Sequence, residues 1–375
     1  MTDPAAPSPL RARDFNIPFD GEPGKHNAIT DVPGLEVGFC TLVSDDPVVA
    51  RTGVTAILPR GKERAGSPCA AGIAVLNGNG ELTGRSWIEE SGQLQAPIAI
   101  TNSHAVGAVH SGIDRWMAEH HPHTAAAWML PVVGETWDGY LNSINAETVQ
   151  AEHAAAALNA AAIGPVAEGN VGGGTGMNCY GFKGGTGTAS RIVHGLDRDY
   201  TVGVLLQANF GSRNELKVAG RPLGRESAAP NPMDQGDWFA REAGFGEATP
   251  GAGSIIVVVA TDAPLLPDQC RALARRVPLG LARTGTTASH FSGDIFLAFS
   301  TANEGSLTSR MGTKTGSIEH LEVLSWGGID PLYAATVEAV EEAVVNALIA
   351  ARDTVGRDGH ASYALPHDEI RAAFQ

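Results

Sequence analysis

The chain has 375 residues, 43% of them hydrophobic, which is enough to form the core of one large α/β domain or of two average ones. Its 41 acidic and 26 basic residues give a formal net charge of −15, and this negative field argues against nucleic acid and anionic membranes as partners. The four cysteines lie far apart without a C-x-x-C spacing, so neither a disulfide framework nor a zinc knuckle is indicated.

The N-terminal residues 1–14 are rich in Pro and Ala and contain no continuous apolar stretch like that of a signal peptide. No later apolar run approaches the length needed to span a bilayer. We therefore expect a soluble protein without membrane partners that is cytoplasmic by default. A periplasmic location stays open if the N-terminus has been trimmed.

Short apolar runs rich in β-branched residues, bounded by Gly, Pro, Asn or Asp, predict strands along most of the chain. In chain order they are residues 54–58, 73–76, 98–101, 202–206, 255–260 and 295–299, and helical periodicity is clearest at 154–163 and 332–354. Several runs are too continuously apolar to have a solvated face, so we expect buried strands between helices. The elements do not alternate strictly as β-α-β, which argues against a TIM barrel or a simple Rossmann sheet and favours a layered α/β sandwich.

The longest stretch without a clear strand or helix pattern is residues 213–253, which is rich in Gly, Pro, Asn, Asp, Ser and charge. It ends abruptly at the apolar run 255–260. A loop of this length in a compact domain tends to be functional or disordered. Core strands are predicted on both sides of it, so we interpret residues 1–375 as one domain.

Four glycine-rich stretches, residues 77–81, 169–176, 181–187 and 251–253, need an explanation. Lys183 stands among glycines, but its spacing is not that of a phosphate-binding P-loop, and no stretch meets the conditions for a dinucleotide-binding turn. We therefore predict no cofactor. The glycines more plausibly let backbone segments approach closely or form a pocket wall.

The only dense histidine cluster in the sequence is His120-His-Pro-His123, which has no carboxylate partner at a helical i, i+4 spacing. A solvated helix end or loop is the favoured interpretation, and we predict no metal site. The hydrolase motifs G-x-S-x-G and H-E-x-x-H are absent, as is S-x-x-K in a suitable context. The common serine and zinc hydrolase mechanisms are therefore weakly supported.

Two serines, Ser254 and Ser292, stand directly before apolar runs, where a strand end would hold them rigidly for chemistry that needs a fixed attack geometry. If the chain were cut between Gly253 and Ser254, Ser254 would carry an α-amine, a group whose pKa is about 7.7–8.0. Nucleophile and base would then occupy one residue. On spacing alone, however, Gly-Ser before a strand is an ordinary turn.

The sequence resembles the DmpA-like family of self-processing aminopeptidases, which includes the L-aminopeptidase/D-alanyl esterase-amidases and the β-peptidyl aminopeptidases. The resemblance spans almost the whole chain. Its most specific blocks are residues 27–32, 53–59, 172–176, 181–191, 253–258 and 292–296.

The resemblance implies a four-layer α-β-β-α sandwich like that of N-terminal nucleophile hydrolases, with the family's own DmpA-type connectivity. It also implies autocleavage between Gly253 and Ser254 into an α chain, residues 1–253, and a β chain, residues 254–375, which stay together. Family members assemble as tetramers of the αβ unit.

Four catalytic residues are carried over by the resemblance. Ser254 matches the nucleophile, Ser292 the second serine that hydrogen-bonds near it, and Asp294 the acidic residue that orients that serine. A carboxylate two residues from a serine on a strand points to the same face, so this pair is geometrically sensible. Asn209 matches the oxyanion-hole asparagine, although a strand-end cap would be its ordinary interpretation.

Substrate binding is implied for two further residues. Glu135 matches the carboxylate that holds the free amino group of a short peptide, amide or ester, because a buried carboxylate needs a cationic partner. Trp137 stands where the amidase-type member has Tyr and the β-peptidyl aminopeptidases have Trp, which favours β-amino-acyl substrates. Residues 289–291 also differ from the Asn-rich segment of the amidase-type member.

Other functions stay open. The main rival is an L-aminopeptidase with D-alanyl esterase or amidase preference. N-acetylornithine-type acyl transfer uses a threonine nucleophile, so Ser254 argues against it. An uncleaved binding or scaffold protein is disfavoured because all the residues of the catalytic set are present.

Overall fold

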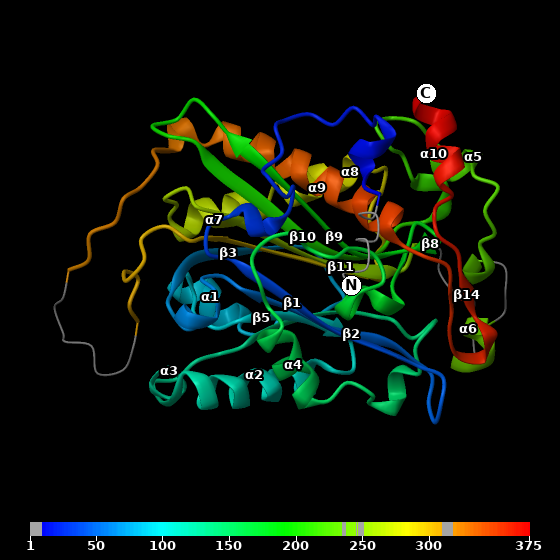
Figure 1. Ribbon diagram of the computed structural model, residues 1–375, viewed down its shortest axis with the longest axis horizontal. Coiled ribbons are helices and arrows are strands. Elements are labelled where there is room, and N and C mark those ends of the chain that lie inside the picture. The colour runs from blue at the N-terminus through cyan, green and yellow to red at the C-terminus, as the bar shows by residue number, and fades with distance from the viewer. Residues whose placement is uncertain (1–9, 235–237, 245, 247–250, 310–317) are drawn as a thin grey trace, which may run out of the picture.

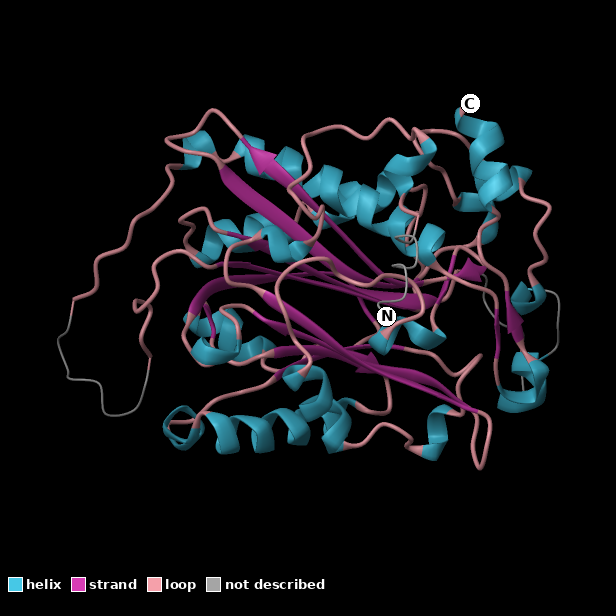
Figure 2. Ribbon diagram, in the orientation of Figure 1, coloured by secondary structure: helices cyan, strands magenta, loops and turns pink. Residues whose placement is uncertain are grey.

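A computed structural model describes residues 10–234, 238–244, 246, 251–309 and 318–375. Two β-sheets lie face to face in the middle of the molecule, and helices cover the outer face of each (Figures 1 and 2). The described part of the chain therefore has the four layers α-β-β-α, and the predicted sandwich is confirmed.

The larger sheet has six strands in the order β4-β3-β12-β11-β10-β9. Adjacent strands within this sheet run antiparallel, except for β11 and β12, which run parallel. The bounds are Cys69–Gly78 for β3, Gln93–Leu94 for β4, Gly185–Val193 for β9, Tyr200–Asn209 for β10, Gly253–Thr261 for β11 and Ser292–Ser300 for β12.

The smaller sheet has the order β1-β2-β5-β6 and packs against the inner face of the larger one. Its strands are β1 (Glu36–Ser44), β2 (Ala50–Leu58), β5 (Ile98–Asn102) and β6 (Val132–Thr136). Only the β5 and β6 pair is parallel. The remaining described strands form two small pairs, β7 (Asn178–Cys179) with β8 (Phe182–Lys183) and β13 (Thr354–Val355) with β14 (Ala361–Ser362).

Helix α9 (Asp330–Ala350) lies across β9 and β10 on the outer face of the larger sheet, and α7 (Pro267–Ala274) lies on β3 and β12. The outer face of the smaller sheet is covered by α2 (Val106–His120) and α4 (Ala151–Asn159). The other described α-helices are α1 (Arg85–Ser91), α3 (Pro122–Ala126), α5 (Leu223–Glu226), α6 (Trp238–Ala243), α8 (Val277–Arg283) and α10 (His367–Phe374). Within the described residues, no helix is both long and apolar enough to cross a membrane.

The apolar run of β11 is continuous because both faces of the strand are buried. Ile256 and Val258 point into the layer between the sheets, whereas Ile255 and Val257 belong to the core under α7, α8 and α9. A strand buried on both faces has no solvated side to alternate with. This placement fixes the residues at the start of β11 between packed layers.

All six predicted strands are confirmed, but both helix predictions extend too far. Helix α4 ends at Asn159 rather than 163, because Ala162 instead pairs with Val37 on β1. Helix α9 ends at Ala350, and Thr354 begins β13. The segment 213–253 is less irregular than expected, since its described part contains α5 and α6.

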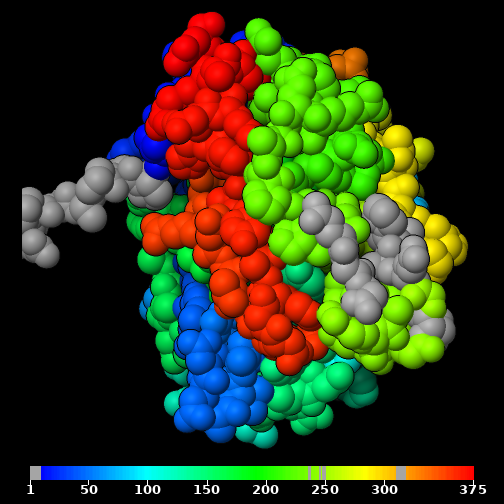
Figure 3. All heavy atoms as spheres, turned by 90° about the vertical axis from the view of Figure 1, so that its right-hand side faces the viewer, coloured from blue at the N-terminus to red at the C-terminus, as the bar shows by residue number. Residues whose placement is uncertain are grey.

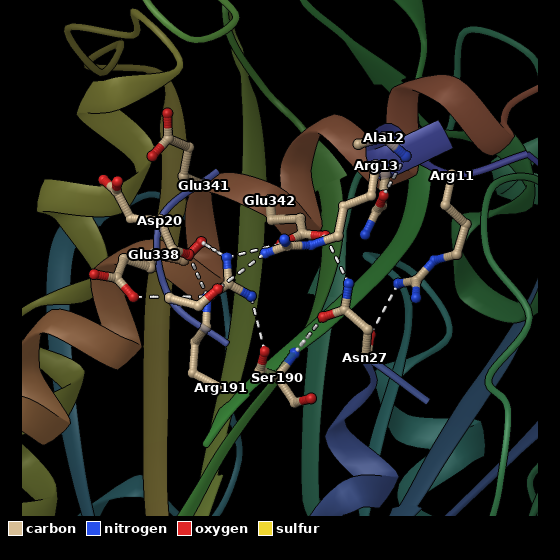
Figure 4. A network of polar contacts seen from close by, with 12 residues as sticks. Arg11, Ala12, Arg13, Asp20, Asn27, Ser190, Arg191, Glu338, Glu341 and Glu342 are labelled. Carbon is tan, nitrogen blue, oxygen red and sulfur yellow. Dashed lines mark hydrogen bonds and ion pairs between the residues drawn. The ribbon is translucent and has the colours of Figure 1, made fainter. Parts of the chain in front are cut away.

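A buried polar network ties the N-terminal part of the chain to α9 (Figure 4). The fully buried Glu342 accepts hydrogen bonds from Arg191 Nη2 at 2.7 Å, from Arg13 Nη2 at 2.9 Å and from Asn27 Nδ2 at 2.6 Å. Removing one partner of such a group leaves an uncompensated buried charge. The network therefore joins segments that precede Gly253 to a helix that follows it.

Candidate active site

Strands β10, β11 and β12 end at one place, and this brings the predicted catalytic residues together. Ser254 at the start of β11 is paired with Asn209 at the end of β10 and with Gly293 on β12, and Ser292 lies opposite Gly253. The end of an antiparallel strand and the starts of two parallel strands meet at the same sheet edge. Ser254 is only 3% exposed, so this edge is enclosed.

Ser292 and Asp294 form a hydrogen-bonded pair beside this edge. Ser292 Oγ donates to Asp294 Oδ1 at 2.6 Å, and Asn77 Nδ2 donates to the other carboxylate oxygen at 2.7 Å. Burial raises the pKa of Asp294, while the hydrogen bonds from Ser292 and Asn77 oppose that shift. Asn77 was not among the predicted site residues, although it lies in the first glycine-rich stretch.

The side-chain amide of Asn209 has a fixed orientation. Its Oδ1 accepts from the backbone N–H of Asn178 at 2.8 Å, and its Nδ2 donates to the carbonyl oxygen of Trp137 at 2.9 Å. Because a backbone N–H can only donate and a carbonyl only accept, the two ends of the amide cannot be exchanged. An amide nitrogen carries two N–H bonds, so one of them is left for a substrate oxygen.

Lys183 holds the backbone that precedes Asn178. Its ammonium is fully buried and donates to the carbonyl oxygens of Met177 at 2.8 Å, Gly184 at 2.9 Å and Gly174 at 3.3 Å. Burial lowers its pKa to about 7. Lys183 therefore fixes the glycine-rich turn that leads into Asn178, which agrees with the prediction that these glycines do not bind phosphate.

Glu135, at the end of β6 in the other sheet, supplies a buried carboxylate 6% exposed to solvent. Its Oε1 accepts from the backbone N–H of Glu81 at 2.9 Å, and its Oε2 accepts from Ser103 Oγ. Burial raises the pKa of Glu135, and these two hydrogen bonds oppose the shift. Ser103 carries no sequence signal that would have assigned it to the site, whereas Glu81, like Asn77, belongs to the first glycine-rich stretch.

A close backbone approach brings Glu81 to Glu135. A Cβ atom at Gly293 would overlap the carbonyl oxygen of Asn79, so only glycine lets the loop 77–81 cross β12. Gly80 lies directly against this point. The first glycine-rich stretch thus acts as predicted, by permitting close packing.

One pocket of about 650 Å³ is lined by residues from both sheets, whereas Ser292 and Asp294 line a small separate cavity beside it. Ser254, Asn209 and Glu135 all line the larger pocket, and aromatic rings form much of the remaining wall. The aromatic lining residues are Trp137, Phe210, Trp238, Phe239 and Phe291. Such a mixture of an apolar wall with a few converging polar groups is typical of a small-molecule site.

Comparison with known proteins agrees with this geometry. Residues 27–362 match the model of peptidase family S58. The chain belongs to this family. It is 48% identical to the beta-peptidyl aminopeptidase BapA of Sphingosinicella microcystinivorans, over 97% of this chain and 92% of that protein.

Two solved structures are also similar to this chain. A beta-aminopeptidase from a Burkholderia species is 46% identical, with a TM-score of 0.87 over 97% of this chain and 98% of that one. The L-aminopeptidase D-Ala-esterase/amidase of Ochrobactrum anthropi, described as a new variant of the Ntn hydrolase fold, is 44% identical, with a TM-score of 0.88 over 96% and 97%. The predicted family resemblance, the DmpA-type fold and the assignment as an aminopeptidase are confirmed.

The histidine cluster lies away from this S58 site. The ring of His120 stacks on Trp116 with centroids 4.6 Å apart, and His121 Nε2 hydrogen-bonds the carbonyl oxygen of Lys62. Among the described residues, no three His, Cys, Asp or Glu side chains are grouped so that they could hold a metal ion. The histidines lie at the junction of α2 and α3, where His120 and His121 have structural contacts and His123 is exposed.

Proposed function

We propose that this S58 protein is a self-cleaving aminopeptidase in which Ser254, freed as a new N-terminus, is both nucleophile and base. The observation that carries the proposal is that Ser254, the oriented amide of Asn209 and the buried carboxylate of Glu135 line one pocket. In this proposal residues 1–375 form one domain, which is processed into an α chain of 1–253 and a β chain of 254–375.

Self-cleavage begins when Ser254 Oγ attacks the carbonyl carbon of Gly253. The bond from that carbon to the Ser254 nitrogen breaks as the ester bond forms, and the hydroxyl proton ends on the released amine. Water then hydrolyses the ester and leaves a carboxylate on Gly253. Position 253 requires glycine for packing, since a Cβ there would overlap the carbonyl oxygen of Asn209.

Turnover uses the same atoms on a substrate amide or ester. Glu135 holds the substrate ammonium, Asn209 Nδ2 donates to the oxyanion, and the Ser254 amine takes the hydroxyl proton and passes it to the leaving group. Ser292, oriented by Asp294, positions the Ser254 amine. Water or a second amine then takes the acyl group from Ser254.

The burial of Glu135 explains why a free amino group would be required. An N-blocked substrate would leave an ionised carboxylate unpaired in an enclosed site, which is costly. An ammonium group pairs with it and stabilises the ionised form. Selectivity for the first residue of a chain follows.

We favour β-amino-acyl substrates because of Trp137, which stands in the pocket wall beside Asn209, and because relatives named as beta-peptidyl or beta-aminopeptidases are 48% and 46% identical. The alternative is an L-aminopeptidase with D-alanyl esterase or amidase activity, as named for the relative that is 44% identical. Hydrolysis of β-homo-amino-acyl p-nitroanilides, compared with that of L- and D-alanyl p-nitroanilides, separates the two.

We further propose that the two chains stay together and assemble as a homo-oligomer, a tetramer of αβ units. The Glu342 network supports the first part, since it would join the α chain to the β chain by buried charged hydrogen bonds. Light scattering of the native protein gives the mass of the assembly. Dissociation of the chains without denaturant would contradict the proposal.

A denaturing gel with N-terminal sequencing tests self-cleavage. We expect two bands, the smaller beginning Ser-Ile-Ile-Val, in place of the 38.9 kDa chain. Ser254→Ala should stay whole and inactive, whereas Ser306→Ala, outside the pocket lining, should be cut normally. Active protein that runs as a single band of full length would overturn the proposal.

A further inference from the structure

One part of the aromatic lining, the wall formed by Trp137, Trp238 and Phe239, stands apart from the main cores. Trp238 on α6 stacks near Trp137 with ring centroids 6.1 Å apart and meets Tyr140 edge-on at 5.1 Å. Together with Leu141 it forms a small cluster, separate from the three larger hydrophobic clusters of the described residues. The position of this wall therefore depends on local contacts.

Helix α6 cannot hold the wall in place by itself. It has only six residues, and helices this short are not stable without tertiary contacts. Trp238 Nε1 donates to the carbonyl oxygen of Met233 at 2.9 Å, which is a local contact within the same segment. The anchor for α6 must include a contact to another part of the fold.

The C-terminal segment 354–363 provides such a contact. In Figure 3 it runs, in orange and red, directly against the green segment that leads into α6, and in Figure 1 β14 lies beside α6. The ring of His360 stacks on Tyr140 with centroids 4.6 Å apart, and its Nδ1 donates to the Tyr140 carbonyl oxygen at 2.8 Å. The segment thus lies behind the wall, on the side away from the pocket.

Arg357 in this segment joins the two halves of the wall. Its Nε donates to the carbonyl oxygen of Gly139, two residues after Trp137, at 2.6 Å. Its Nη2 donates to Glu242 of α6, also at 2.6 Å, and its Nη1 to Asp358 at 3.0 Å. The planar guanidinium fixes the relative direction of its donors, so it sets the distance between the two halves. The Arg357 side chain is only 17% exposed, which limits screening by solvent.

We propose that Arg357 is a specificity-determining positioning residue, which holds Trp238 against Trp137 so that the wall binds a large apolar side chain on the first residue of the substrate. This inference rests on the proposed function. Among the described residues, the side-chain hydrogen bonds of Arg357 go to Gly139, Asp358 and Glu242 rather than to Ser254 or Glu135, so it acts through the wall. After cleavage it would be a contact between the two chains, because Glu242 and Gly139 precede Gly253.

The test compares kcat and KM for β-homophenylalanyl and β-alanyl p-nitroanilide. Arg357→Gln should lower kcat/KM for the aromatic substrate about fivefold, mainly by raising KM, and change the β-alanyl value by less than about twofold. Glu242→Gln, which alters only the more exposed partner, should act in the same direction. The double variant should be no worse than Arg357→Gln, because both changes remove one contact.

Arg271→Gln is the control for loss of an arginine ion pair, because Arg271 pairs with Asp268 on α7, an exposed pair far from α6 in Figure 1. It should leave the ratio of the two substrates unchanged. In an active enzyme, an equal loss on both substrates, an unchanged ratio or additive single effects would overturn the inference and leave the proposed function intact. A wild-type protein that cleaves neither substrate would overturn both.

Discussion

The two sides of the pocket are built differently. On one side, Ser254, Asn209 and Ser292 are held by three adjacent strands of one sheet, in register. On the other side, Glu135 comes from the second sheet, and the aromatic wall comes from α6 and the segment after β6. The reaction groups are thus fixed by backbone pairing, whereas the selecting groups are fixed by side-chain contacts between distant segments.

This difference predicts that substitutions on the two sides of the pocket have different effects. Changes on the strand side should lower kcat and also slow self-cleavage. Both reactions pass through an oxyanion, and the same donor, Asn209, stabilises it in each. Changes on the other side should alter substrate binding and leave self-cleavage intact.

The largest effect is expected for Asn209→Ala. Loss of an oxyanion donor lowers kcat by about 10²–10³, and KM should change little. Self-cleavage should slow as well, seen as full-length chain persisting on a gel. Asn303→Ala, whose side chain contacts the exposed Glu322, is the control. A kcat within threefold of the wild type would mean that the Asn209 amide is a strand-end cap only.

The strand side was also the side that the sequence revealed best. The apolar runs placed Ser254 and Ser292 at strand starts, whereas their catalytic roles, and Asp294 as a site residue, came from the family resemblance. Strand partners could not be read from the sequence, since nothing in residues 202–206 or 255–260 states which strand lies beside which. The pairing of Asn209 with Ser254 therefore emerged only from the structure.

The other side was readable only through the family resemblance. Ser103 and Glu81 reach Glu135 from separate loops, and no local pattern marks a residue whose role is set by a contact across the pocket. Arg357 is 115 residues from Glu242. Hydrophobic periodicity reports burial of an element, and it carries no information on such long-range polar contacts.

Glu135→Gln should have the next largest effect. The substituted side chain keeps its shape but loses the charge, so kcat/KM for substrates with a free amine should fall about 10- to 100-fold, as expected for a hydrogen bond to a charged group. Self-cleavage should continue, because it uses no substrate amine. The rate on N-acetylated substrates should rise, because the neutral Gln is no longer left as an unpaired buried charge. Failure of this variant to process would place Glu135 on the reaction side.

Ser103→Ala tests how the carboxylate is kept ionised. The serine hydroxyl opposes the rise in the pKa of Glu135 that burial causes, so its removal should raise that pKa further. Glu135 binds an ammonium only when ionised, and binding is lost as pH falls through its pKa. The acid limb of kcat/KM should therefore move to higher pH, so that the loss relative to the wild type is largest on the acid limb and disappears well above it.

Ser212→Ala is the control for this pH profile, because Ser212 lines the same pocket on the strand side. Its acid limb should coincide with that of the wild type. A Ser103→Ala profile that falls equally at every pH would point to a packing defect instead of a shifted Glu135.

Trp137→Tyr should produce the smallest change, confined to substrate choice. Tyrosine fills less of the wall beside Trp238 and brings a hydroxyl donor to the pocket, so the preference for β-homo-amino-acyl over L-alanyl p-nitroanilide should fall about threefold. Trp326→Tyr, on an exposed tryptophan outside the pocket lining, should leave the preference unchanged. Self-cleavage should be unaffected, because the Asn209 amide contacts the backbone carbonyl of residue 137 and not its ring. If Trp137→Tyr slowed self-cleavage as much as Asn209→Ala, the two sides of the pocket would not be separable, because the wall would then also set the oxyanion geometry.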